Sequence, residues 1–163
     1  MFLEASKLPA RVLGGMAVLS VAAVAIAVIA QHYFDVRPCP WCVLQRGIFL
    51  VLAALSGLGW LLARKRTARQ AVLVGCALIC LAGLTAAVFQ HEVASQSASC
   101  KLGLADKLLE TLNLEELWPQ VFMVTGNCAD AAAYHLLGLP YEVWSGLLFA
   151  GFGALSVVAL GKR

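Results

Sequence analysis

The sequence CPWC, from Cys39 to Cys42, is the segment best able to carry out chemistry. Two thiols separated by two residues can form a disulfide, bind a metal or exchange electrons with another dithiol. Pro40 suits the first position of a helix, which would make Cys39 the capping residue. The unpaired amides at a helix N-terminus favour a thiolate. We therefore expect a reactive dithiol at the start of a helix.

A second pair of cysteines, Cys100 and Cys128, lies further along the chain with 27 residues between them. Disulfides Cys39–Cys42 and Cys100–Cys128 could act as structural staples, but a bridge across a two-residue gap constrains an unfolded chain little. A zinc ribbon needs a second pair of closely spaced cysteines, and the long gap supplies none. The spacing favours redox chemistry, and we expect no metal site. We expect both pairs to be bridged in the resting protein.

Three polar residues lie close to the CPWC segment along the expected helices. Arg46 follows Cys42 by four residues and would share its helix face one turn deeper. An arginine inside a membrane span usually marks a functional site, although near a helix end it can extend to the lipid headgroups. Gln45 adjoins Arg46, and His91 ends a later apolar stretch. Together they could surround a polar headgroup whose tail lies in the bilayer.

The composition identifies the solvent of this protein as the lipid bilayer. The chain has 163 residues, of which 61% are hydrophobic and 13% charged, and its mean hydropathy is +0.85. Soluble domains average roughly 45–50% apolar and about 25% charged residues. The net charge of +3 does not indicate nucleic-acid binding, because the basic residues flank apolar segments.

Four apolar stretches are long enough to cross a bilayer, which takes about 20 residues. They cover residues of about 11–34, 42–63, 71–90 and 143–160. The first is too long for a signal peptide and has no small-residue cleavage site before His32. We predict an all-α membrane protein, a four-helix transmembrane bundle formed by one membrane domain over residues 1–163.

Cys76 and Cys80 lie in the third stretch, where we expect them to act as small buried hydrophobes.

The basic residues indicate the orientation of the protein in the membrane, since cytoplasmic loops are rich in Lys and Arg. Eight of the twelve flank the proposed inner ends, namely Lys7, Arg11, Arg64, Lys65, Arg66, Arg69, Lys162 and Arg163. We therefore expect both termini in the cytoplasm and two outer loops, at about 35–41 and 92–142.

The second outer loop contains the sequence LADKLLETLNLEELW. It places Leu104, Leu108, Leu109 and Leu112 at helical spacing, with charged residues between them. This pattern predicts a short amphipathic helix, either lying on the membrane surface or packed on the rest of the loop.

Several short motifs occur in a fixed order across nearly the whole chain. They are RPCPWCVLQR, a basic turn RKRTAR, FQHE, SCKLG, LWPQVFMVTGNC and LGLPYEVW. In this order they resemble the DsbB family of disulfide-bond-forming membrane proteins. The resemblance implies a thiol:quinone oxidoreductase of the bacterial inner membrane, with ubiquinone or menaquinone as electron acceptor. It also implies that the partner is a DsbA-like thioredoxin-fold protein; a DsbA–DsbB–quinone system is already known to keep the bacterial periplasm oxidising.

The resemblance also implies a role for each outer cysteine. The reduced partner would attack Cys100, and Cys128 would then pass the electrons to Cys39. Cys42 would face the quinone. A DsbA-type partner is a strong oxidant, so its reoxidation needs a still more oxidising acceptor, and a carrier dissolved in the membrane is suitable.

Arg46 matches the family arginine that supports quinone, and His91 matches a histidine that aids thiolate chemistry. Gln45 departs from the family's best-known pattern, which has an acidic residue there, and the dipeptide between the cysteines is Pro-Trp.

Two alternative functions belong to other classes of protein. A quinone enzyme resembling vitamin K epoxide reductase would carry its C-x-x-C late in the chain. A scaffold with structural disulfides offers no reason for Arg46 beside a C-x-x-C.

Overall fold

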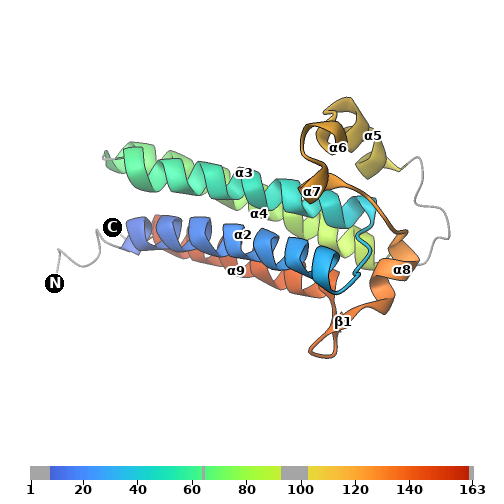
Figure 1. Ribbon diagram of the computed structural model, residues 1–163. Coiled ribbons are helices and arrows are strands. Elements are labelled where there is room, and N and C mark those ends of the chain that lie inside the picture. Colours follow the sequence, from blue (N-terminus) through green and yellow to red (C-terminus); the bar gives the residue numbers. More distant parts are fainter. Residues whose placement is uncertain (1–7, 64, 93–102, 162–163) are drawn as a thin grey trace.

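Four long helices form the body of the protein, as the hydropathy predicts (Figure 1). The computed structural model describes residues 8–63, 65–92 and 103–161. Each long helix is apolar and long enough to cross a membrane. Their bounds are α2 Leu8–Tyr33, α3 Pro40–Leu62, α4 Arg66–Glu92 and α9 Tyr141–Gly161. Helices α2 and α3, α3 and α4, and α4 and α9 pack against each other, and α2 also contacts α9.

Each long helix begins two to five residues before the apolar stretch that predicted it. Helix α4 begins at Arg66, whereas the apolar stretch begins near residue 71. Hydropathy detects the part of a helix that lies in hydrocarbon, but backbone hydrogen bonding continues into its polar ends. Helix α3 begins at Pro40, and Cys39 caps it with extended backbone angles, as the sequence predicts.

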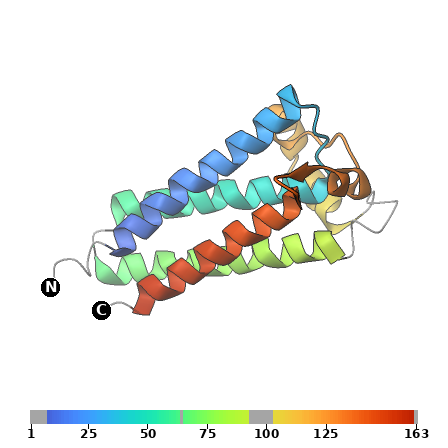
Figure 2. The same ribbon diagram turned by 90° about the horizontal axis from the view of Figure 1, so that it is seen from below.

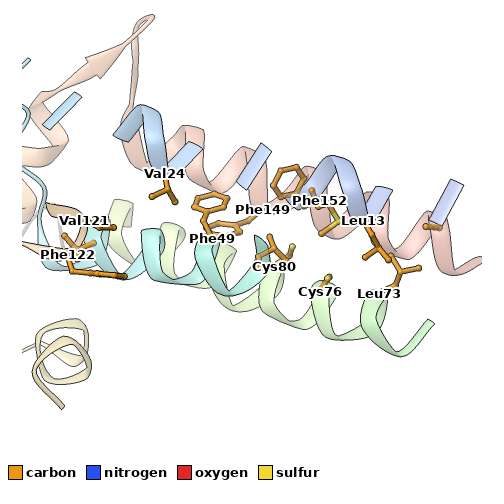
Figure 3. Close-up of a cluster of buried hydrophobic side chains, with 14 of the residues drawn as sticks. Leu13, Val24, Phe49, Leu73, Cys76, Cys80, Val121, Phe122, Phe149 and Phe152 are labelled. Atoms are coloured by element: carbon orange, nitrogen blue, oxygen red, sulfur yellow. The ribbon is translucent and has the colours of Figure 1, made fainter. Parts of the chain in front are cut away.

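Aromatic stacking and close helix approach hold the centre of the bundle (Figure 3). The rings of Phe49 on α3 and Phe149 on α9 are stacked, with centroids 4.1 Å apart and planes at 11°. Gly83 on α4 lies against the Phe149 ring, where a Cβ atom would be only 2.6 Å from the ring carbons. A glycine therefore lets α4 and α9 approach around this ring, as small residues do in membrane bundles.

Cys76 and Cys80 lie in the same apolar cluster, 0% and 2% exposed (Figure 3). Both are free thiols facing the interior of the bundle. The prediction that they serve as small buried hydrophobes is consistent with this placement.

The described part of the long loop between α4 and α9 is more structured than the sequence predicts. The amphipathic segment forms α5 (Leu104–Thr111), which packs against α3. Leu109 is buried in this contact, whereas Leu104, Leu108 and Leu112 are exposed. The rest of the predicted helix is broken at Asn113, which has left-handed backbone angles, and continues as a short helix, α6 Leu114–Leu117. Two further short helices and a hairpin were not predicted: α7 Pro119–Phe122, α8 Cys128–Ala133, β1 His135–Leu136 and β2 Leu139–Pro140.

The hairpin of β1 and β2 pairs His135 with Pro140 and Leu136 with Leu139 in antiparallel register. Leu137 and Gly138 form its two-residue turn, both with positive φ (53° and 85°). Such a turn matches the twist of the paired strands. It brings the chain from α8 back to the start of α9.

The start of α2 and the end of α9 lie at one end of the bundle, and the helices α5 to α8 lie at the other (Figure 1). We call this second end, which carries Cys39, Cys42 and Cys128, the cysteine end. Figure 2 shows α2 and α9 diverging toward it. The elements of the long loop cover this end of the bundle.

Candidate redox site

Cys39 and Cys42 form a close dithiol at the start of α3. Their Sγ atoms lie 3.0 Å apart, and the backbone N–H of Cys42 donates a hydrogen bond to Cys39 Sγ (3.4 Å). Both are free thiols, so the structure holds the dithiol form and not the disulfide that the sequence led us to expect. Between them, Trp41 packs on Phe89 of α4, with ring centroids 4.9 Å apart. This aromatic contact fixes the first turn of α3 against its neighbour.

Cys128, the first residue of α8, packs directly against Cys39. Both are fully buried and share a small cluster with Ala131, Trp41 and Cys42. The helix is started by Asn127, whose side chain accepts a hydrogen bond from the Asp130 N–H (2.8 Å). Three of the four predicted redox cysteines are thus in one cluster. Cys100, the fourth, lies outside the described residues.

Backbone contacts hold the loop before α8 against the loop before α3. The N–H groups of Thr125 and Gly126 both donate to the carbonyl oxygen of Pro38, each at 3.1 Å. Gly126 lies so close to Arg37 that a Cβ atom would be 2.8 Å from the Arg37 carbonyl oxygen. These contacts are two residues from Cys128 and one from Cys39, so they set the register of the two sulfurs.

The environment of Cys39 differs from the one expected for a helix N-terminus. A hydrogen bond with the Cys128 side chain is the largest cause raising the pKa of Cys39 above its ordinary value. Burial raises this pKa further, while the hydrogen bonds from Cys42 lower it. The expectation of a thiolate stabilised by helix amides is therefore wrong for Cys39 in the dithiol form, because its thiol partner and its burial outweigh the helix end.

Arg46 is buried, with 6% of its surface exposed, and does not extend toward the bundle surface. Its Nη1 donates to Gln31 Oε1 (2.6 Å) and to the carbonyl oxygen of Val121 (2.9 Å). Its Nη2 donates to the Ala27 carbonyl oxygen (3.3 Å). All three acceptors are neutral, so they hold the guanidinium in place without cancelling its charge. The alternative that Arg46 serves only as a headgroup anchor does not fit this burial.

A chain of two glutamine amides leads to Cys42. Gln45 Nε2 donates to Gln90 Oε1 (2.8 Å), and Gln90 Nε2 donates to Cys42 Sγ (3.2 Å). Gln45 and Gln90 are 2% and 1% exposed. Sequence reasoning selected Gln45 but missed Gln90, although a polar residue just before His91 at the end of an apolar span was a signal.

His91 extends to α9. Its Nδ1 lies 3.2 Å from Glu142 Oε1, and its side chain is 49% exposed while that of Glu142 is 1% exposed. Sequence reasoning placed His91 near the quinone headgroup; the structure instead places Glu142 between His91 and the pocket. Glu142 was missed because its burial depends on α9 packing beside α4.

A pocket of about 250 Å³ opens between α2, α3 and α9 at the cysteine end. Cys42, Gln45 and Arg46 line it from α3, and Glu142 lines it from α9. Most of its other walls are apolar, including Ala23, Val24, Ile26, Ala27, Ala30, Phe49 and Leu148. A sulfur, a fixed cation and a carboxyl group therefore line an otherwise apolar cavity, which is typical of a site for a small amphipathic molecule.

Four long apolar helices with a dithiol, a third cysteine and a buried arginine at one end define a membrane protein of thiol–disulfide chemistry. Residues 9–159 match the DsbB family, described as Disulfide bond formation protein DsbB. The chain belongs to this family.

Named relatives agree along nearly the full length. The chain is 33% identical to Disulfide bond formation protein B of Verminephrobacter eiseniae, over 94% of this chain and 87% of that protein. It is 30% identical to the protein of the same name from Polaromonas naphthalenivorans, over 98% and 96% of the two chains. The corresponding protein of Dechloromonas aromatica is 28% identical over 86% and 85%. This chain is therefore a multi-pass membrane protein of disulfide bond formation.

Proposed function

We propose that this protein oxidises the dithiol of a DsbA-like thioredoxin-fold partner and transfers two electrons to a membrane quinone, ubiquinone or menaquinone. One observation carries the proposal. Cys42 and Arg46 line one pocket, and the other cysteine of the dithiol, Cys39, contacts Cys128 from the long loop. A path from the loop to the pocket is therefore continuous through three sulfurs.

The residues of the pocket fit a quinone headgroup. A quinone ring is apolar on its faces and has two carbonyl oxygens that accept hydrogen bonds. The apolar walls suit the faces, and Arg46 supplies donors in the same cavity. At about 250 Å³ the pocket is slightly smaller than typical ligand sites, which hold roughly 300–1,000 Å³. It suits a headgroup whose isoprenoid tail remains in lipid.

Electrons enter through thiol–disulfide exchange, in which a thiolate attacks one sulfur of a disulfide. A partner thiolate attacks Cys100 and releases Cys128. Cys128 Sγ then attacks Cys39 Sγ, forming a Cys39–Cys128 bond and breaking the Cys39–Cys42 bond. Cys42 leaves as a thiolate in the pocket wall. The second thiol of the partner then attacks the mixed disulfide and releases Cys100, and Cys100 re-forms its bond with Cys128, which leaves Cys39 and Cys42 as the reduced dithiol. The contact of Cys39 with Cys128 supports the second exchange.

The chain's own residues prepare Cys42 for this thiolate. Gln90 Nε2 already donates to its sulfur, and Gln45 holds the Gln90 amide in that orientation. Arg46, one helical turn deeper, adds a fixed positive charge in a medium of low dielectric constant. A bound quinone supplies the acceptor for two electrons and two protons. Arg46 and Gln45 would hold its headgroup beside Cys42.

The location follows from the same proposal. We infer a bacterial inner membrane, with the cysteine end in the periplasm, where disulfides persist. The opposite end of the bundle, where α2 starts and α9 ends, would face the cytoplasm, consistent with the Lys and Arg residues that flank the spans in the sequence. A reporter active only in the periplasm, fused after Arg163, should therefore be inactive.

The decisive experiment uses detergent-purified protein and a reduced thioredoxin-fold oxidase. We expect partner oxidation only when ubiquinone or menaquinone is added, with one quinol formed per partner disulfide. The Cys100→Ala variant should lose partner oxidation, yet its Cys39/Cys42 pair should still be oxidised by quinone. Partner oxidation at the same rate without any quinone would contradict the proposal.

A further inference from the structure

Glu142, in the first turn of α9, is a buried carboxyl group in the pocket wall. Its side chain is 1% exposed, and Oε1 is 3.2 Å from His91 Nδ1. The other oxygen, Oε2, is buried and has no hydrogen-bond partner among the residues that the structure describes. Burying a carboxylate oxygen without a partner is costly, and such a group in a cavity is a candidate for function.

The charged groups that line the pocket show which residue is the partner of Glu142. Among the pocket-lining residues of the described chain, Glu142 is the only carboxyl group, and Arg37 and Arg46 are the cations. Glu142 forms no ion pair with either within the described structure, so its partner is His91 from α4. Cys42 lines the pocket from α3. The carboxyl group and the dithiol therefore face the same cavity from different helices.

His91 connects this carboxyl group to the aqueous side. Half of its side chain is exposed at the end of α4, while its ring contacts Glu142 Oε1. An imidazole can accept a proton at one nitrogen and release one from the other. Glu142 lines the pocket and His91 does not, so the order from the exposed histidine to the pocket is His91 and then the Glu142 carboxyl group.

We propose that Glu142 donates a proton from Oε2 to the quinone oxygen in this pocket, and that His91 resupplies it from water. This inference rests on the proposed function and adds a proton path to it. Oxidation of the Cys39/Cys42 dithiol to a disulfide releases two electrons and two protons, and reduction of quinone to quinol consumes two of each. Glu142 gives one proton to the quinone and is reprotonated from water through His91. One thiol proton goes to the second quinone oxygen and the other leaves to water, so the reaction balances.

A substitution at Glu142 can separate quinone binding from proton delivery. A protonated carboxyl group both donates a hydrogen bond and transfers the proton, whereas a glutamine amide only donates. Glu142→Gln should therefore keep quinone affinity within about twofold of the unsubstituted protein. General acid catalysis contributes typically 10²–10⁴-fold, so the single-turnover rate of quinol formation should fall by about 100-fold.

The test mixes prereduced full-length protein in detergent with a short-tailed ubiquinone and follows quinol absorbance. Binding is measured separately on the oxidised protein by quenching of tryptophan fluorescence, since Trp144 lines the pocket. Infrared difference spectra recorded with and without the quinone should show a protonated-carboxyl band that is lost in Glu142→Gln. His91→Phe should slow turnover, and imidazole in the buffer should restore part of the rate.

The matched control is Glu110→Gln, an identical change at an exposed carboxyl group on α5. It should leave the rate, the affinity and the infrared band unchanged. A wild-type rate in folded Glu142→Gln, or an unchanged carboxyl band, would overturn the proton path. Failure of the unsubstituted protein to reduce quinone at all would instead overturn the proposed function. If Glu142→Gln does not fold, Glu142→Asp, with a shortened carboxyl group, should bind quinone but deliver protons more slowly; an unchanged rate would overturn the inference.

Discussion

The side-chain amide of Gln90 donates a hydrogen bond to the sulfur of Cys42 across 3.2 Å. Gln90 is on α4 and Cys42 on α3, so the bond joins two spans at the cysteine end. Gln45 does not bond to the sulfur itself. Its amide N–H donates to the Gln90 oxygen at 2.8 Å, which orients the Gln90 N–H groups toward the sulfur. Gln90, a neutral residue, is thus positioned to stabilise the Cys42 thiolate that the proposed reaction forms.

Replacing Gln90 by leucine should slow the reaction at Cys42. A hydrogen bond to a charged group contributes roughly 1.5–3 kcal/mol, so its loss should reduce the thiolate population by about 10-fold or more at a given pH. Thiolate absorbance of a Cys39→Ser variant, recorded against pH with and without Gln90→Leu, measures this effect.

The control for this prediction is Gln120→Leu, because Gln120 is an exposed residue of α7. It should leave the titration of Cys42 unchanged. Equal titration curves for Gln90→Leu and the parent variant would show that the observed bond does not stabilise the thiolate.

Replacing Gly126 by alanine should disturb the contact of Cys128 with Cys39. The new Cβ would lie 2.8 Å from the Arg37 carbonyl oxygen and force the loop away from Pro38. Displacing reacting groups by about 1 Å can cost roughly 100-fold in rate. We expect a Cys42→Ser variant to form a Cys39–Cys128 disulfide under mild oxidation, and Gly126→Ala to slow this by at least about 10-fold.

Gly15 offers a matched control for that substitution. No atom lies within 4 Å of the position where its Cβ would be, so Gly15→Ala should leave disulfide formation unaffected. Mass spectrometry of the trapped bond gives the rate for both variants. Equal rates would mean that the loop register does not control the exchange.

The reactivity of Cys39 in the reduced protein should depend on Cys128. The hydrogen bond with Cys128 and burial raise the pKa of Cys39, so its thiol keeps the proton at neutral pH and ionises only as the pH rises. Cys128→Ala removes the largest of these causes. The pH midpoint for alkylation of Cys39 should therefore shift downward, measured by mass spectrometry of the labelled peptide. Cys76→Ala, in the bundle core, should not move it.

Better reagent access in Cys128→Ala would raise the alkylation rate at every pH without moving the midpoint. The two effects are therefore separable in one titration. An unchanged midpoint would mean that burial alone controls the acidity of Cys39.

The sequence predicts well what depends on local pattern. Apolar runs predict the four spans, and Pro40 beside Cys39 predicts the start of α3, because hydropathy and capping are properties of neighbouring residues. The sequence does not predict that Gln90 donates to Cys42 or that His91 meets Glu142. Both contacts join helices that are far apart in the chain, and only the packing of the bundle brings them together.

The raised pKa of Cys39 has the same origin. Local reasoning considers the helix amides but not the distant Cys128, which packs on Cys39 only because the loop before α8 is bonded to Pro38. Long-range contacts thus decide the chemistry of residues whose positions were predictable.

Arg46 provides the last prediction. Its guanidinium is buried, lines the pocket with Cys42 and is held by three neutral oxygens, so its charge is available to a bound anion or carbonyl oxygen. Removing a charge-assisted hydrogen bond costs about 1.5–3 kcal/mol, which is roughly 10- to 150-fold in binding or rate. Arg46→Ala should lose this much in the quinone dependence of partner oxidation. Arg46→Lys should recover only part, because an ammonium keeps the charge but lacks the planar fork.

The same arginine also joins α3 to Gln31, Ala27 and Val121, so its variants can weaken the fold. Thermal unfolding in detergent must therefore be compared with kinetics at a temperature where all variants are folded. Arg11→Ala, at an exposed position near the opposite end of the bundle, should change neither measurement. A reduced melting temperature with unchanged quinone KM and kcat in Arg46→Ala would make Arg46 a structural residue only. It would also remove Arg46 from the proposed quinone site, leaving Arg37, Gln45 and Glu142 among the polar pocket residues that could bind the headgroup.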